Sequence, residues 1–89
     1  MTLGNSKIGH MLRLSFRTSK KNQDIIREAE GFFQNKGLET KEKGDCCLQM
    51  EGGGGYVRVD IVEAKDREVI LETREWEYQV KEFAEHHGK

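Results

Sequence analysis

Hydrophobic and polar residues alternate along five segments of the chain, and in two other segments the hydrophobic residues recur every three to four positions. Alternation with a period of two is typical of a strand with one buried face, and the longer period is typical of an amphipathic helix. The segments follow one another in the order strand, helix, four strands, helix. One hydrophobic layer must serve all of them, as expected of a single domain of this size.

The first strand and the first helix are predicted from residues 12–37. Residues 12–17 alternate, and Thr18 and Ser19 follow them. We expect the hydroxyls of Thr18 and Ser19 to cap the helix, because such side chains accept hydrogen bonds from the unpaired amides of a first turn. Lys36 and Gly37 are predicted to end the helix, since glycine readily adopts a positive φ. Its hydrophobic stripe consists of Ile25, Ala29, Phe32 and Phe33, with Ile26 at the edge.

Four strands with short connections are predicted next, as an antiparallel meander. Residues 38–43 carry enough charge to indicate an edge strand, and Gly44-Asp45 follows as a turn. In the following strand, residues 46–51, alternate side chains are expected to point to the core and to the open face. The core set is Cys46, Leu48 and Met50, and the outward set is Cys47, Gln49 and Glu51. Residues 56–63 and 69–74 alternate in the same way around a polar turn at 64–67.

The run Gly52, Gly53, Gly54 and Gly55 separates two of these strands. A phosphate-binding glycine loop leads from a strand into a helix, and a P-loop is followed by lysine and a hydroxyl residue. Here the glycines lead into a strand, so we interpret them as a hairpin connection. Four glycines exceed what a two-residue turn requires, because glycine loses much backbone entropy on folding. A flexible loop that contributes to function, or to binding of a small ligand, remains an alternative.

The second helix is predicted from a stripe at helical spacing that ends at Gly88, with Glu75 and Glu77 at its start. The stripe consists of Trp76, Val80, Phe83, Ala84 and His87. His87 is interpreted as a packing residue. Both stripes are narrow, so we expect the two helices to lie side by side on one face of the sheet. The fold class is therefore α+β, a two-layer sandwich whose other sheet face is open.

This order of elements resembles one repeat of the TATA-binding-protein fold and the small archaeal proteins of unknown function that share it. The resemblance covers residues 11–88 in topology, without a matching motif, so no residue role follows from it. In the TATA-binding protein the open sheet face lies on DNA, and two repeats form a saddle. The resemblance therefore implies that a similar saddle would require two copies of this chain.

Composition narrows the classes of function. The chain has 89 residues, no proline and a net charge of −1, which gives no general attraction to nucleic acid or anionic lipid. Residues 1–27 nevertheless carry a charge of +5, and the remainder carries −6. No segment is hydrophobic enough to span a membrane, and we expect a cytoplasmic protein. Residues 1–10 lack a pattern and are expected to form a disordered tail that is an expression remnant, outside the domain 11–89.

The two cysteines and the histidines near the C-terminus form no convincing metal or catalytic site. Cys46 and Cys47 should point to opposite faces of a strand, and His86 and His87 about 100° apart on a helix. At most one member of each pair could reach a common zinc ion. We interpret Cys46 as a core residue and Cys47 as a surface thiol. No nucleophile, base and orienting group can be assigned together, so we expect no enzyme, metal or cofactor.

The open sheet face is the remaining candidate site. Arginine and tyrosine together can hold phosphate and stack on bases. The hypothesis is a nucleic-acid interface formed by Arg13, Arg17, Lys20, Lys21, Tyr56 and Arg58. The alternatives are an ordinary solvated face and a protein–protein or self-association surface, on this face or at an edge strand. We expect a monomer or a weak homodimer.

Overall fold

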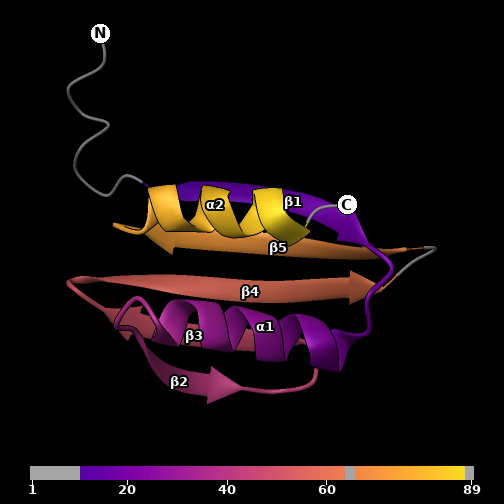
Figure 1. Cartoon of the computed structure of the whole chain (residues 1–89), viewed down its shortest axis with the longest axis horizontal. Coiled ribbons are helices and arrows are strands. Elements are labelled where there is room, and N and C mark those ends of the chain that lie inside the picture. Colours follow the sequence, from indigo (N-terminus) through magenta and orange to yellow (C-terminus); the bar gives the residue numbers. More distant parts are fainter. Residues whose placement is uncertain (1–10, 64–65, 88–89) are drawn as a thin grey trace, which may run out of the picture.

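The computed structural model describes residues 11–63 and 66–87. Its elements confirm the predicted order β-α-β-β-β-β-α (Figure 1). They are β1 (Leu12–Thr18), α1 (Asn22–Gln34), β2 (Glu39–Lys43), β3 (Cys47–Gly52), β4 (Gly55–Glu63), β5 (Arg67–Arg74) and α2 (Glu77–His87). The expectations for residues 1–10, for Gly88 and for the first half of the turn at 64–67 lie outside the described residues.

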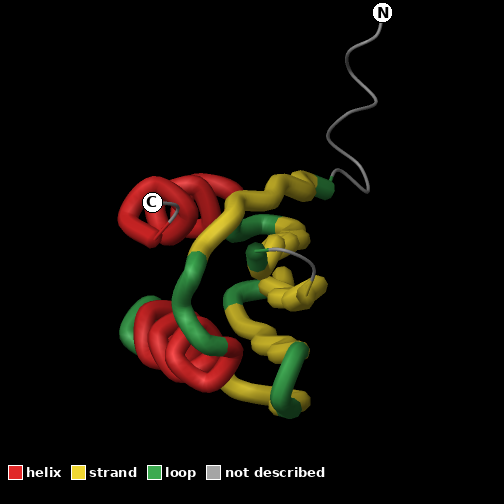
Figure 2. The backbone as a smooth tube through the Cα atoms, turned by 90° about the vertical axis from the view of Figure 1, so that its right-hand side faces the viewer, coloured by secondary structure: helices red, strands yellow, loops and turns green. Residues whose placement is uncertain are grey.

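The five strands form one antiparallel sheet in the order β1-β5-β4-β3-β2. Strands β2 to β5 make the expected meander, and β1 pairs with β5, the last strand of the meander. Both helices cover the same face (Figure 2). The helix α1 packs over β2 and β3, and α2 packs over β1 and β5. The structure is thus the two-layer sandwich predicted from the sequence, with one sheet face left open.

The hydrophobic core lies between the sheet and the helices. Because side chains alternate along a strand, every second side chain of each inner strand points into this core. The hydrophobic stripes of the two helices pack against them. Phe33 of α1 and Phe83 of α2 meet there, with ring centroids 5.7 Å apart. The largest fully buried side chains are those of Phe33, Phe83, Leu48, Met50, Leu71, Val57, Val59, Val69, Val80 and Thr73.

The start of α1 differs from the prediction. Lys21 is the N-cap residue, and its side chain makes no capping hydrogen bond. Because β1 continues to Thr18, that side chain is buried. Its hydroxyl accepts a hydrogen bond from the amide of Lys20 at 3.2 Å and stabilises the turn before the helix. The hydroxyl of Thr18 therefore stabilises the turn before α1 and, contrary to the prediction from the sequence, does not cap the helix.

The end of α1 is as predicted. Gly37 has φ +106°, and its amide donates to the carbonyl of Gln34 at 3.0 Å. The amide of Leu38 then donates to the carbonyl of Phe33 at 3.1 Å. This pair of bonds closes a helix when a glycine adopts the left-handed conformation. It turns the chain back toward the sheet and places β2 beside β3.

The two edge strands differ in character. Strand β2 is short and charged, and its register with β3 shifts between Thr40 and Glu42. Such a bulge and such charges oppose pairing with another molecule. Strand β1 keeps an unbroken register with β5, from Leu12 opposite Thr73 to Thr18 opposite Arg67. The molecule therefore has one protected edge and one regular edge.

Candidate functional site

The glycine run forms the tight turn of the β3–β4 hairpin. Gly52 is paired with Gly55, and Gly53 and Gly54 between them have φ +58° and +84°. Two central residues with positive φ are the requirement of a type I′ turn, which suits the twist of a hairpin. The chain continues directly into β4, so the geometry of a phosphate-binding loop is absent from this turn. The hairpin interpretation is confirmed.

Tight packing explains the outer glycines of the run. A Cβ on Gly55 would collide with the carbonyl oxygen of Arg74 and with the side chain of Glu75. A Cβ on Gly52 would lie 3.1 Å from the backbone that follows α1. One added to Gly53 would lie 3.0 Å from the ring of Trp76. The excess of glycine over the needs of a two-residue turn is therefore accounted for by backbone contacts.

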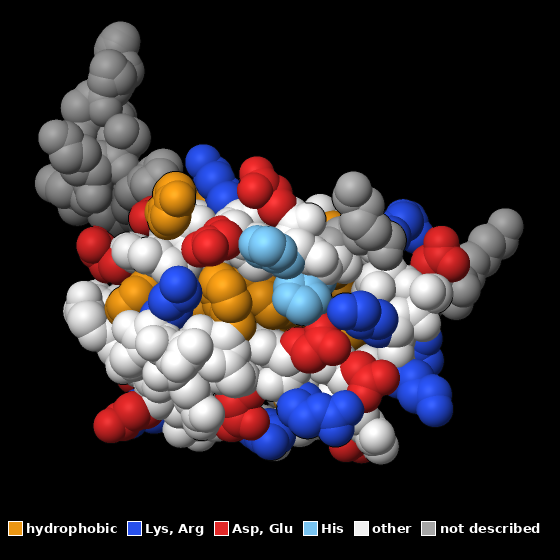
Figure 3. Space-filling model, viewed as in Figure 1, with side chains coloured by type: hydrophobic (Ala, Val, Ile, Leu, Met, Phe, Trp, Pro, Cys, Tyr) orange, Lys and Arg blue, Asp and Glu red, His pale blue; other side chains and the backbone are white. Residues whose placement is uncertain are grey.

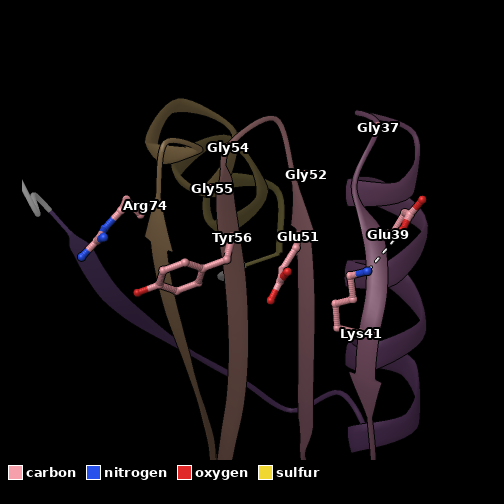
Figure 4. A pocket seen from close by; sticks show the side chains of 9 residues that line it. All are labelled: Gly37, Glu39, Lys41, Glu51, Gly52, Gly54, Gly55, Tyr56 and Arg74. Carbon is pink, nitrogen blue, oxygen red and sulfur yellow. Dashed lines mark hydrogen bonds and ion pairs between the residues drawn. The ribbon is translucent and has the colours of Figure 1, made fainter.

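A shallow hollow of about 540 Å³ lies beside this turn on the open face (Figure 4). Its charged lining is balanced, because Lys41 and Arg74 are accompanied by Glu39 and Glu51. The ammonium of Lys41 lies 3.4 Å from the carboxylate of Glu39. The ring of Tyr56 extends from β4 across the sheet toward β5. The hollow thus offers a mixed polar surface without a single sign of charge.

The open face alternates in charge from strand to strand. Arg13 on β1 lies opposite Glu72 on β5, and Glu72 lies opposite Arg58 on β4. Arg17 lies opposite Glu68 in the same way. The arginines proposed to hold phosphate therefore each have a carboxylate beside them. This arrangement weakens the attraction of the face for a polyanion.

Tyr56 belongs to the same network. Its hydroxyl donates a hydrogen bond to Glu72 at 2.8 Å. This bond, together with burial, raises the pKa of the Tyr56 phenol. The tyrosine thus remains protonated and fixed against β5. Four of the six proposed interface residues, Arg13, Arg17, Tyr56 and Arg58, do share the open face.

Lys20 and Lys21 are not brought to that group. The ammonium of Lys20 lies 2.9 Å from Glu28 of α1 and 3.3 Å from Nδ1 of His87 of α2. It therefore belongs to the helix layer, on the other side of the sheet. Lys21 occupies the N-cap of α1. The continuous basic surface expected from the sequence is divided by the sheet itself.

His87 joins the two helices. Its ring stacks on Phe83 with a centroid distance of 4.2 Å, and Nδ1 lies 3.0 Å from Glu28. Figure 3 shows the histidines beside the hydrophobic side chains of the helix face. Burial lowers the pKa of His87, and the charge of Lys20 lowers it further, whereas Glu28 acts in the opposite direction. The surroundings are those of a packing residue, as the sequence indicated.

The two cysteines are placed differently from the prediction. Cys46 is exposed, Cys47 is half-buried, and their sulfur atoms lie 2.7 Å apart. Strand β3 begins only at Cys47, and the amide of Gly44 donates to the carbonyl of Cys47 at 2.8 Å, which closes the β2–β3 turn. The alternation that was to bury Cys46 therefore does not extend to it. The prediction of a core Cys46 with its thiol directed away from Cys47 is wrong.

Among residues 11–63 and 66–87, no three His, Cys, Asp or Glu side chains converge in a way that could hold a metal ion. Neither α1 nor α2 has the length and hydrophobicity that a membrane-spanning helix needs. The regular outer edge of β1 is the feature that sequence reasoning missed, and its three half-buried side chains are Leu12, Leu14 and Phe16.

No protein-family model and no curated protein matches this sequence.

Proposed function

We propose that this domain is a binding module rather than an enzyme, and that it self-associates through the outer edge of β1. The observation that carries the proposal is the contrast between the edges. Strand β1 is seven residues long, without a bulge, and in the described part of the chain β5 is its one neighbour. An edge of this kind presents unpaired amides and carbonyls to another strand.

The side chains of β1 favour a second copy of the same strand as the partner. Leu12, Leu14 and Phe16 pack against the core but remain partly exposed on the helix face. Antiparallel pairing of two β1 strands keeps these residues on one face, because side chains alternate with a period of two. The two α2 helices would then lie on the same side, over a joint apolar surface. Association would complete the burial that one chain leaves unfinished.

Charge distinguishes two registers of this pairing. With Leu14 on the two-fold axis, Leu14 faces its counterpart and Leu12 faces Phe16 of the second copy. Arg13 then faces Ser15. With Ser15 on the axis, Arg13 would instead face Arg17, and like charges directly opposite each other are destabilising. We therefore propose the register centred on Leu14. The resemblance to the TATA-binding-protein repeat, whose saddle contains two repeats, supports the pairing of two copies of this chain.

The test uses Ser15, an exposed residue of β1. Ser15→Lys would place a lysine opposite Arg13 twice per dimer, and Ser15→Glu would place a carboxylate there. At up to about 1 kcal/mol per pair and two pairs per dimer, the dissociation constants of these variants should differ by up to about thirtyfold, in opposite directions, from that of the unmodified chain. Glu42→Lys on the β2 edge is the matched control and should change nothing.

Analytical ultracentrifugation across a wide concentration range measures the outcome. The expected result is a concentration-dependent mass that approaches twice 10.3 kDa. A monomer at every concentration would overturn the proposal. So would equal effects of Ser15→Lys and Ser15→Glu, because that result would place the contact away from Arg13.

Binding of single-stranded nucleic acid to the open face is the second candidate, and the exposed arginines around Tyr56 favour it. Aromatic stacking contributes roughly 1–3 kcal/mol per base, and phosphate contacts make binding strongly salt-dependent. With a fluorescent oligonucleotide at low salt, Arg58→Ala and Tyr56→Leu should both weaken binding. Arg27→Ala on α1, where Arg27 pairs with Asp24, should not. Binding that is undetectable at low salt would eliminate this candidate.

A further inference from the structure

The adjacent thiols of Cys46 and Cys47 lie at the start of β3, apart from the β1 edge. Their sulfur atoms are 2.7 Å apart, one exposed and the other half-buried. The carbonyl of Cys47 is held by Gly44, and the carbonyl of Cys46 accepts a hydrogen bond from Ile61 on β4 at 2.8 Å. The backbone of both cysteines is thus fixed by the sheet, and the two thiols lie side by side.

We propose that Cys46 and Cys47 form a thiol–disulfide exchange site, which a low-molecular-weight disulfide converts reversibly into a ring disulfide between the two residues. This chemistry is independent of pairing at β1, since the cysteines and that edge are separated by two strands of the sheet.

The two thiols have unequal roles. Cys46 is exposed and meets the reagent first. A hydrogen bond with Cys46, then burial, and then the neighbouring Asp60 raise the pKa of Cys47 to about 12. Cys47 therefore keeps its proton while Cys46 is attacking, because the thiolate is the nucleophilic form of a cysteine. The geometry assigns attack to Cys46 and resolution to Cys47.

The reaction has two steps. In the first, the Cys46 thiolate attacks one sulfur of the reagent disulfide, forms a mixed disulfide and releases one thiolate. In the second, Cys47 gives up its proton to solvent, and its sulfur attacks the sulfur of Cys46 and displaces the second thiolate. In total, two protein thiols are oxidised, one small disulfide is reduced to two thiols, and the protein loses two hydrogen atoms.

Ring strain makes the product easy to reduce. Consecutive Cα atoms are about 3.8 Å apart across a trans peptide, whereas bridged cysteines usually have Cα atoms about 4.4–6.8 Å apart. A disulfide between neighbours is therefore strained, and strained disulfides have more oxidising potentials. The site is thus suited to a reversible change rather than to a permanent cross-link.

Intact mass spectrometry of the full chain, reduced and then treated with oxidised glutathione, tests the proposal. The unmodified chain should show a transient adduct of one glutathione, and then a species without glutathione that has lost two hydrogen atoms. Cys47→Ser should stop at the single adduct. Cys46→Ser should form an adduct more slowly, because its remaining thiol is half-buried. Dithiothreitol should restore the starting mass in every case.

Three results would overturn the proposal. The first is a mass that does not change with oxidised glutathione. The second is a stable adduct on the unmodified chain, as on Cys47→Ser, because Cys47 would then not resolve it. The third is equal reaction rates for the two serine variants, which would remove the assigned roles. Circular dichroism of each variant controls for folding, and both cysteines lie outside the buried core.

Discussion

Trp76 donates its indole N–H to the carbonyl oxygen of Gly52 at 2.8 Å, which joins the start of α2 to the β3–β4 hairpin. Trp76 directly precedes the helix, and its carbonyl accepts from the amide of Val80 at 2.9 Å. One side chain therefore fixes both the beginning of α2 and the position of the glycine turn, two parts of the chain that are far apart in sequence.

Trp76→Phe should lower the free energy of unfolding by about 1 kcal/mol. The variant keeps an aromatic ring against the turn but removes the hydrogen bond to Gly52, and a net hydrogen bond contributes about this amount. Urea unfolding followed by circular dichroism measures the change. Tyr78→Phe is the control, because Tyr78 is 75% exposed and should unfold as the unmodified chain does. A loss that is equal in both variants would contradict the role of the indole N–H.

Three glycine-to-alanine variants should rank in a definite order. Gly54→Ala meets open space but requires a left-handed residue, which costs about 1–2 kcal/mol. Gly55→Ala should lose more, about 3 kcal/mol or more, because the carbonyl of Arg74 occupies the place of the new methyl group. Gly31→Ala in α1 should gain about 0.5–1 kcal/mol. Urea midpoints give the ranking, and equal losses for Gly54→Ala and Gly55→Ala would contradict it.

The His87 contact should make stability depend on pH. Its pKa is lower in the folded chain than the ordinary 6.5, so the unfolded chain binds more protons in this range. The contribution of His87 to the free energy of unfolding is therefore complete above pH 6.5. It is lost as the pH falls from 6.5 toward the pKa of His87 in the folded chain. His87→Gln should flatten this part of the stability profile. His86→Gln should change the profile less, because the charge of His86 makes only a smaller contribution to the lowered pKa of His87. A profile flattened equally by both variants would assign the effect elsewhere.

Glu30 should stabilise the β2 edge through its charge. It accepts hydrogen bonds from Lys43 at 2.7 Å and from Thr40 at 2.6 Å, and these bonds lower its pKa below 4.5. Its contribution is present above pH 4.5 and is lost as the pH falls through the lowered value. Glu30→Gln should cost about 1 kcal/mol at pH 7. The difference from the unmodified chain should shrink in acid, and a constant difference would exclude the carboxylate charge as its cause.

Local patterns predicted the elements of this fold correctly because alternation and helical spacing involve only near neighbours in sequence. Gly37 was correctly placed at the end of α1 for the same reason, since its effect is confined to one turn. The position of β1 beside β5 depends on contacts between distant segments, and no local pattern specifies them. The outer edge of β1 therefore became visible only in the structure.

The candidate residues were predicted less well, because a binding surface depends on what surrounds each side chain. Arg13 and Arg58 were rightly assigned to the open face by alternation. Glu72 on β5 lies opposite both arginines and neutralises them. The sequence pattern does not determine the register that places it there. Lys20 was assigned to the same surface because it follows β1 closely in the sequence. The chain leaves the sheet after β1, however, and Lys20 lies in the helix layer. Cys46 was misplaced because its strand begins one residue later than the pattern indicated.

The bulge and the charges of β2 limit how far assembly through the sheet could proceed. Two chains joined at β1 would leave a β2 strand at each end of the combined sheet, and the irregular register near Thr40 and Glu42 would face the next molecule. A regular strand at both edges would permit endless addition and hence fibres. With one edge of each kind, growth by strand pairing would end at two chains.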